Sequence, residues 1–304
     1  MTAGTTTPVQ RSQSGLLLPA ALLVGLLALL GWQAGALRLP AADGMAPVPQ
    51  TVRIAPRPYA YRAVGSFLSD GAVVDGPLIE VATPAPLELM TYQVSVGEYA
   101  RCVAAAACRP AQPRRGADRP DLPVTGVSHD DAMRYADWLG AATGAAWRLP
   151  TVAEWVFAAG SRAGDDALGL VANTANPAER WLAAYAQETA AATGAAAQPL
   201  PRGTGGLNEH GVADLAGPVW EWTATCDGRT TLAPDGSVLR RLEACGAHYL
   251  EGRHRAVMTN FVRDAASGGC STGLPPDNLG FRLVREPGWV GTVAGWWAGL
   301  FGGR

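Results

Sequence analysis

The sequence predicts an α+β domain with much irregular backbone, preceded by one apolar helix. Two segments carry helix-capping signals ahead of apolar residues at helical spacing. The segments expected to be strands are short and separated by Gly and Pro, and no alternation of strand and helix suggests a parallel sheet. Of the 304 residues, 48% are hydrophobic and 16% are charged, which excludes a disordered chain.

Charge and composition exclude several classes of function. The formal net charge is −2, so no basic surface indicates a nucleic-acid partner. The chain contains no lysine, and all 24 of its basic residues are arginine. A Walker-type phosphate loop needs its lysine and a Schiff base needs an amine, so both chemistries are excluded.

An apolar segment lies close to the N-terminus. After a short segment at 1–14, residues 15–37 contain the uncharged run Leu16–Trp32. As a helix this run would be about 26 Å long at ~1.5 Å per residue, enough for a thin bilayer core. We expect a signal anchor in the cell membrane, with a cleaved signal peptide ending near Ala34-Gly35-Ala36 as the alternative.

Both alternatives predict a main domain in the periplasm, either single-pass and membrane-anchored or periplasmic after cleavage. Residues 38–62 are rich in Pro and Ala and are expected to form a linker.

The first half of the globular part begins at about Ala63. Residues Ser66–Leu89 are expected to form strands and turns, Val96–Ala107 a short helix, and Asp121–Val127 a loop or strand. Ser128 and Asp131 form a capping box, so a helix is expected to follow and to end at Gly140 or Gly144.

The second half begins with another capping box, formed by Thr151 and Glu154, which predicts a helix that carries Trp155. Residues 160–218 are expected to be irregular apart from a helix near Ala178–Ala192. Short strands are expected at Val219–Thr225, Val238–Leu242 and Phe281–Val284.

Five cysteines are present and none forms a CxxC pair. The spacing suits a local disulfide between Cys102 and Cys108, and Cys226 and Cys245 flank a turn-rich segment that a bridge could close. Cys270 is left over. The alternative is that all five are buried free thiols, and the redox compartment decides between the two.

Four stretches, read together, resemble the formylglycine-generating enzyme, or sulfatase-modifying factor, family. They are Pro123–Leu139, Arg148–Gly160 (RLPTVAEWVFAAG), Gly206–Thr223 (with VWEWT) and Asn278–Val284 (NLGFRLV). The family also includes the catalytic half of the ergothioneine sulfoxide synthases. The resemblance covers about residues 63–286 and implies a compact variant of the C-type-lectin fold. The overall layout is most similar to the NirV-type accessory proteins of copper nitrite reductases.

The resemblance also bears on catalysis. The family enzyme oxidises a substrate cysteine with two of its own cysteines, whose thiolates bind copper(I). In this chain the first of those positions falls on Glu251 and the second near Ala256. Cys245 lies six residues too early. We therefore expect the cysteine–copper mechanism to be lost, and whether copper or iron acts here is left open.

A second possibility concerns the motif His248-x-x-Glu251-x-x-His254. Two imidazoles and a carboxylate could hold a metal ion, and Glu251 could act as a general base. However, residues spaced by three on an extended strand alternate between its two faces. The alternative, that these are solvated or structural residues, is therefore the stronger expectation.

The family binds structural calcium, and two places here resemble its sites. One is Asn173-Thr174 and the other is Glu221. Pro218 replaces an Asn of the family pattern, so the alternative for Glu221 is a buried, hydrogen-bonded carboxylate. Trp155, Trp220 and Trp222 are expected in the core. Arg255, Arg263 and Arg282 are expected to be ion-paired.

The C-terminal residues 287–304 form an apolar tail with three tryptophans, expected either at a membrane interface or packed against a partner. The resemblance to the NirV-type proteins implies an accessory or maturation factor for an exported oxidoreductase such as copper nitrite reductase. A metal- or carboxylate-dependent protein-modifying oxidase is the alternative, and a peptide-binding module is a third possibility.

Overall fold

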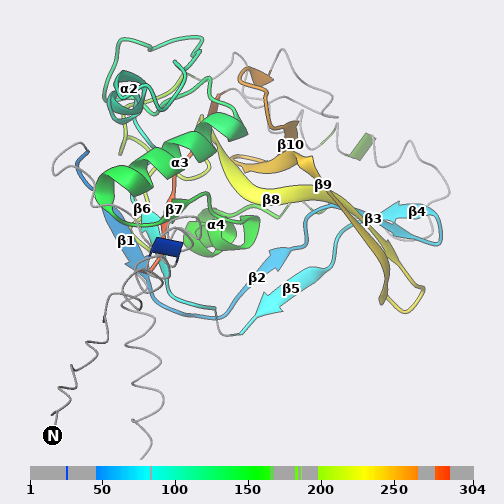
Figure 1. The fold of residues 1–304 in the computed structure, drawn as a ribbon. Coiled ribbons are helices and arrows are strands. Elements are labelled where there is room, and N and C mark those ends of the chain that lie inside the picture. Colours follow the sequence, from blue (N-terminus) through cyan, green and yellow to red (C-terminus); the bar gives the residue numbers. More distant parts are fainter. Residues whose placement is uncertain are drawn as a thin grey trace, which may run out of the picture.

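The computed structural model describes residues 25–26, 46–82, 84–165, 167, 182–183, 186, 198–265 and 278–287 (Figure 1). The mixed α/β fold has few helices. Its helices are α2 (Val96–Ala104), α3 (His129–Thr143) and α4 (Val152–Ala159). Its strands are β1 (Thr51–Ile54), β2 (Tyr59–Arg62), β3 (Ser66–Ser69), β4 (Ala72–Val74), β5 (Leu78–Val81), β6 (Leu87–Met90), β7 (Trp147–Arg148), β8 (Trp220–Leu232), β9 (Val238–Glu251), β10 (Ala256–Thr259), β11 (Leu279–Gly280) and β12 (Val284–Arg285).

The two predicted capping boxes are confirmed. Ser128 caps α3 together with Asp131, and Thr151 caps α4 together with Glu154. The side-chain oxygens satisfy backbone N–H groups that the first helical turn leaves without partners. Helix α3 ends at Thr143, and its C-cap Gly144 has a φ of 68°, a left-handed conformation that glycine adopts without strain.

The described strands form three sheets. One has the order β1-β6-β12-β7, a second has the order β10-β9-β8-β3-β4 with β11 beside β8, and the third is the pair β2-β5. Most neighbouring strands are antiparallel, while β3 and β11 each run parallel to β8. The mixture of short strands and few helices agrees with the predicted α+β class.

Residues 51–62 depart from the predicted linker at 38–62. Strand β1 pairs with β6 from Thr51 to Ile54, and β2 pairs with β5 from Tyr59 to Arg62. The prolines in this stretch fall between the two strands, where no backbone donor is needed for a ladder. The ordered domain therefore begins before Ala63.

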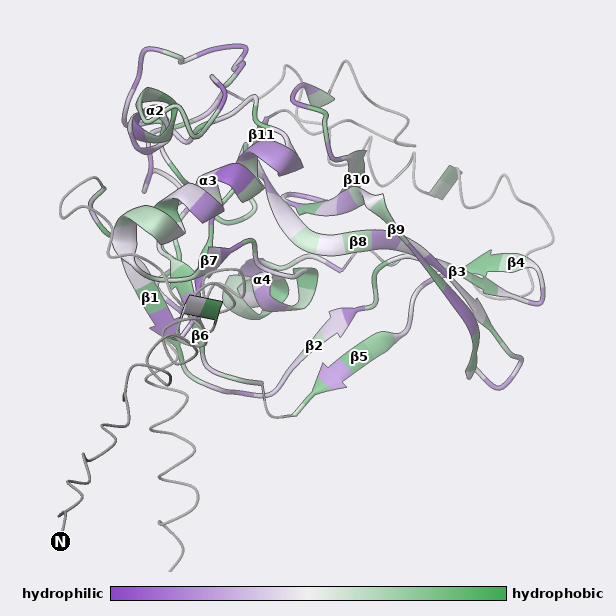
Figure 2. Cartoon of the chain, viewed as in Figure 1, coloured by the Kyte–Doolittle hydropathy of each residue, from purple (hydrophilic) through white to green (hydrophobic). Residues whose placement is uncertain are grey.

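The β8–β9 hairpin is longer than the two short strands predicted there. Its outer part projects from the body beside β3 and β4 (Figure 1), and Figure 2 shows purple, hydrophilic residues along it. Residues 238–246 of β9 are exposed. Because residues 238–246 are exposed on both faces of the strand, their sequence lacks the alternation of apolar and polar residues that identifies a half-buried strand.

The core lies between the helices and the sheets. Trp155 of α4 and Trp222 of β8 are among the largest fully buried side chains, and Trp220 is also buried, so their expected place in the core is confirmed. Trp222 Nε1 donates to the carbonyl oxygen of Val127, just ahead of α3. This bond satisfies the one polar atom of a side chain whose ring is otherwise in apolar contact.

Both predicted disulfides are present, Cys102–Cys108 and Cys226–Cys245. Within the described ranges, no helix is long and apolar enough to cross a membrane. The predicted anchor lies outside the described residues apart from Gly25 and Leu26. The predicted helix at Ala178–Ala192 lies almost wholly outside them, and Cys270 and residues 288–304 lie outside them.

Candidate functional site

Glu251, at the end of β9, lies where the resemblance places the first catalytic cysteine of the family. The residue is 4% exposed, and its Oε1 accepts a hydrogen bond from Nε of Arg255 at 2.6 Å. Ala256, at the second position, begins β10 and is buried. This part of the site therefore holds a buried carboxylate–guanidinium pair.

The motif His248-x-x-Glu251-x-x-His254 does not assemble into a metal site. Nε2 of His248 contacts the sulfur of Cys226, and Nδ1 faces Asn260, whereas Glu251 binds Arg255. The ring of His254 packs edge-on against Trp220. Within the described part of the chain, no group of three or more His, Cys, Asp or Glu side chains could hold a metal ion. His248 and Glu251 are three residues apart on β9 and point to opposite faces, and His254 lies beyond the end of that strand.

Glu221 of β8 is surrounded by hydrogen-bond donors. Arg282 donates to both of its carboxylate oxygens, at 2.6 and 2.7 Å. Gln93 donates to Oε1 at 2.8 Å and Trp155 to Oε2 at 3.0 Å. Each oxygen thus accepts two hydrogen bonds in a buried site, and calcium at Glu221 stays a prediction. Asn173 and Thr174 lie outside the described residues, and calcium there stays a prediction.

The three arginines expected to be ion-paired all are. Arg282 pairs with Glu221, Arg255 with Glu251, and Arg263 with Asp131. Glu221 and Glu251 are also direct cross-strand neighbours of β8 and β9. Like charges in that relation repel at close range. Each carboxylate therefore has its own guanidinium, and the two pairs fix this corner of the sheet.

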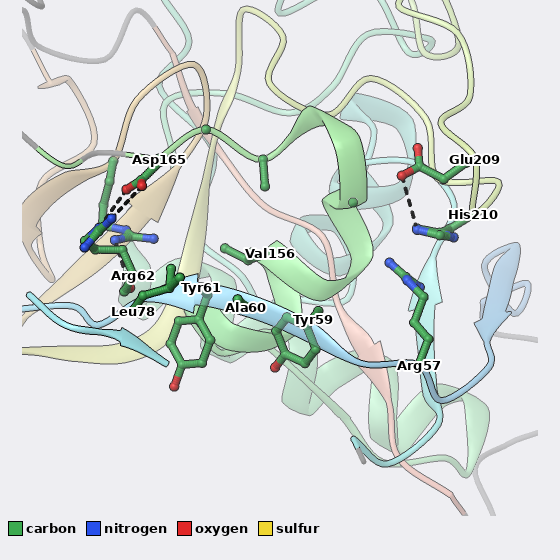
Figure 3. Close-up of a pocket in the computed structure, with 14 residues that line it drawn as sticks. Arg57, Tyr59, Ala60, Tyr61, Arg62, Leu78, Val156, Asp165, Glu209 and His210 are labelled. Carbon is green, nitrogen blue, oxygen red and sulfur yellow. Dashed lines mark hydrogen bonds and ion pairs between the residues drawn. The ribbon is translucent and has the colours of Figure 1, made fainter. Parts of the chain in front are cut away.

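A cavity of about 400 Å³ adjoins the Glu251–Arg255 pair, because Arg255 lines it. Strand β2 forms one wall and Val156 of α4 lies opposite, as Figure 3 shows. Tyr59 and Tyr61 project to the same side of β2, with ring centroids 6.0 Å apart. The cavity is therefore a trough along a strand, with aromatic and aliphatic side chains in the middle.

Charged groups lie at the two ends of this trough (Figure 3). At one end Arg62 donates to both oxygens of Asp165, at 2.6 and 2.7 Å. At the other end lie Arg57, Glu209 and His210. Hydrogen bonds from Ser161 lower the pKa of Glu209 to about 2, and burial lowers the pKa of His210. At neutral pH this end therefore carries an ionised carboxylate, a guanidinium and a neutral imidazole.

The sequence motif that includes VWEWT also builds this end of the trough, although Glu209 and His210 were not predicted as site residues. Asn208 Nδ2 donates to the carbonyl oxygens of Ala158 and Ala159, and its Oδ1 accepts from the backbone N–H of His210 and Val212. Asn208 thereby ties the loop to the end of α4. Glu209 and His210 could have been predicted as site residues, because both lie inside the Gly206–Thr223 motif.

A second cluster was also missed and involves His129, at the start of α3. Its ring stacks on His248, with centroids 3.8 Å apart and an interplanar angle of 14°. Burial, together with the neighbouring His248, lowers the pKa of His129 to about 4. Its Nε2 is buried without a hydrogen-bond partner in the structure as described. Two imidazoles from α3 and β9 therefore lie together beside the Cys226–Cys245 bridge.

Comparison with known proteins identifies the family. The model of the sulfatase-modifying factor enzyme 1-like domain matches residues 37–287. An inactive C-alpha-formylglycine-generating enzyme 2 of Mus musculus is 32% identical over 187 residues, which are 59% of this chain and 54% of that protein. The formylglycine-generating enzyme of Mycobacterium tuberculosis is 36% identical over 194 residues, 56% of this chain and 60% of that enzyme.

Among solved structures, that of PvdO from Pseudomonas aeruginosa is similar, with a TM-score of 0.49 and 23% identity. That match covers 79% of this chain and 95% of PvdO. The chain spans a little over half the length of the curated relatives it matches. The extent of the family match shows that the chain belongs to the sulfatase-modifying factor, or formylglycine-generating enzyme-like, family.

Proposed function

We propose that this protein is a non-catalytic member of its family that assists the maturation of an exported protein. The observation that carries the proposal is the replacement of the expected thiol pair. A buried Glu251 that is bound by Arg255 stands at the first position, and a buried Ala256 stands at the second. Copper(I) is held by soft sulfur ligands, and neither side chain supplies one.

Two further observations support the proposal. The relative from Mus musculus is itself described as inactive. The trough beside Arg255 has the mixed lining expected of a binding site, with an aromatic and aliphatic middle and polar groups at its ends. Its place along β2 suits an extended segment of a partner protein.

The setting that we propose is the periplasm. Cys102–Cys108 and Cys226–Cys245 are bridged, and disulfides persist in oxidising compartments. The apolar run Leu16–Trp32 would hold the domain at the membrane as an anchor or export it as a signal peptide. The partner that we propose is an exported copper oxidoreductase such as nitrite reductase, and calcium near Asn173 would be structural.

The rival proposal is a carboxylate-dependent protein-modifying oxidase. It is favoured by the position of Glu251, whose partner Arg255 lines the trough. The two proposals differ in what the trough must do, because an accessory factor needs only to bind there.

Complementation of a deletion strain tests the accessory role. Ala60 is exposed and lines the trough, so Ala60→Arg should fill the trough without disturbing the core. We expect the deletion to lower the activity of the exported copper oxidoreductase, the wild-type gene to restore it, and Ala60→Arg to leave it near the deletion level.

Ala100→Arg, on an exposed position of α2, is the matched control and should behave as wild type. Normal oxidoreductase activity in the deletion strain would contradict the proposed partner. Full restoration by Ala60→Arg would contradict the role of the trough.

A further inference from the structure

The Cys226–Cys245 bridge lies at an irregularity of the β8–β9 ladder. Cys226 is opposite His248, whereas the next residue, Asp227, is opposite Ala244. Three residues of β9, from Cys245 to Ala247, are thus left over in a bulge. Cys245 is exposed and Cys226 is half-buried. Bulges commonly re-aim a side chain next to a reactive site, and this one presents one end of the disulfide to solvent.

The side chain next to the other end of the disulfide is His248. Its Nε2 lies 3.5 Å from Sγ of Cys226. Its Nδ1 lies 2.7 Å from Oδ1 of Asn260, and Nδ2 of Asn260 donates to the carbonyl oxygen of Cys245. Because that bond fixes which end of the amide faces the ring, Nδ1 of His248 is the donor to Oδ1. Nε2 is therefore the ring atom that can exchange a proton with the sulfur.

His129 completes the arrangement. It is 7% exposed and stacks on His248, which holds the plane of that ring. The other bridge, Cys102–Cys108, differs in both respects. Cys102 and Cys108 are 0% and 7% exposed, and within the described residues no histidine contact is found at either sulfur. The chain therefore carries one buried disulfide and one that is open at one end and contacts an imidazole at the other.

We propose that Cys226–Cys245 is a thiol–disulfide exchange site for cysteine thiols, with Cys245 as the attacked sulfur, Cys226 as the leaving sulfur and His248 as the catalytic acid. This activity goes beyond the proposed accessory role and does not depend on it.

The exchange step forms one S–S bond and breaks another. The thiolate of the incoming cysteine attacks Sγ of Cys245, a new S–S bond forms, and the bond to Cys226 breaks with its electron pair on Cys226. The proton lost by the incoming thiol goes to solvent. An equivalent proton from solvent binds Nε2 of His248, which carries no proton in the neutral ring, and passes from there to Sγ of Cys226. One disulfide replaces another, so no outside oxidant is consumed, and stabilising the leaving thiolate speeds the step.

The experiment uses the full chain and glutathione as the thiol probe, under native conditions. Differential alkylation and peptide mass mapping follow both bridges over time. We expect Cys226–Cys245 to open at least about tenfold faster than Cys102–Cys108, with the mixed disulfide on Cys245. Equal opening rates, or glutathione attached at Cys226, would overturn the assignment.

Two histidine variants test whether the opening rate of Cys226–Cys245 depends on His248 or only on the exposure of Cys245. His248→Gln removes the proton donor, so the opening rate of Cys226–Cys245 should fall by about tenfold while Cys245 stays exposed. His254→Gln removes a half-buried ring that packs against Trp220 and keeps the contact between His248 and Cys226, so its rate should stay within about twofold of wild type. Equal rates in the two variants would refute the role of His248. If His248→Gln does not fold, two wild-type measurements still test the proposal. They are the opening rates of the two bridges and the identity of the cysteine that carries glutathione.

Discussion

Replacing Arg282 with Met is expected to lower the free energy of unfolding by about 3–5 kcal/mol, the usual result of breaking a buried ion pair. Arg282 is 0% exposed and donates to both oxygens of Glu221 and to backbone carbonyl oxygens, including that of Ala213. Met replaces the unbranched stem of the side chain but donates no hydrogen bond, so the charge of Glu221 would stay buried without its guanidinium. Urea unfolding followed by tryptophan fluorescence measures the loss.

Two comparison variants make this result specific. In Glu221→Gln/Arg282→Met the buried charge is removed together with its partner, so the double variant should be more stable than Arg282→Met alone. Arg119→Met breaks an exposed pair with Asp121 and should leave the urea midpoint unchanged. An Arg282→Met protein as stable as Arg119→Met would show that the Glu221 pair does not hold the core together.

The second large effect is expected at Glu251. Glu251→Gln should destabilise the domain by about 2–4 kcal/mol, because Arg255 would keep its charge in a site where only 9% of its side chain is exposed. Arg255→Gln should cost a similar amount, because Glu251 would lie beside Glu221 without its own cation. Chemical denaturation of Glu251→Gln, Arg255→Gln and the double variant completes a double-mutant cycle.

The double variant Glu251→Gln/Arg255→Gln should be more stable than the sum of the single losses indicates. It should also restore partner maturation when it is folded, because the proposed role assigns no chemistry to Glu251. Additive losses would contradict a direct pair. A folded double variant that fails to complement would favour the rival oxidase.

The two capping boxes were predicted because each lies within four consecutive residues. Ser128 with Asp131, and Thr151 with Glu154, depend on local geometry that tertiary contacts did not override. Arg282 and the core tryptophans were predicted because the family motifs contain them, although the partner of Arg282, Glu221, is 61 residues away in the chain. The local disulfide Cys102–Cys108 spans a short loop, so its spacing was informative.

Other features depend on contacts between distant segments. Strands β1 and β2 were not predicted, because the stretch that contains them is rich in Pro and Ala. Their extended conformation depends on pairing with β6 and β5, respectively. The pairing of His129 with His248 joins α3 to β9, and nothing in either local sequence signals it. The burial of Glu251 also depends on its ion pair with Arg255, four residues later, which the sequence pattern did not predict as a pair.

We propose, as the central point, that the site binds a partner protein and does not oxidise a substrate cysteine. A peptide-cysteine oxidation assay tests it most directly. The full chain is incubated with copper(I), oxygen, a dithiol and a cysteine peptide, and mass spectrometry measures formylglycine. The enzyme of Mycobacterium tuberculosis serves as the positive control. We expect no product above the protein-free background from this chain, with ample product from the control. Formylglycine formed by the wild-type chain and lost in a folded Glu251→Gln variant would contradict the account.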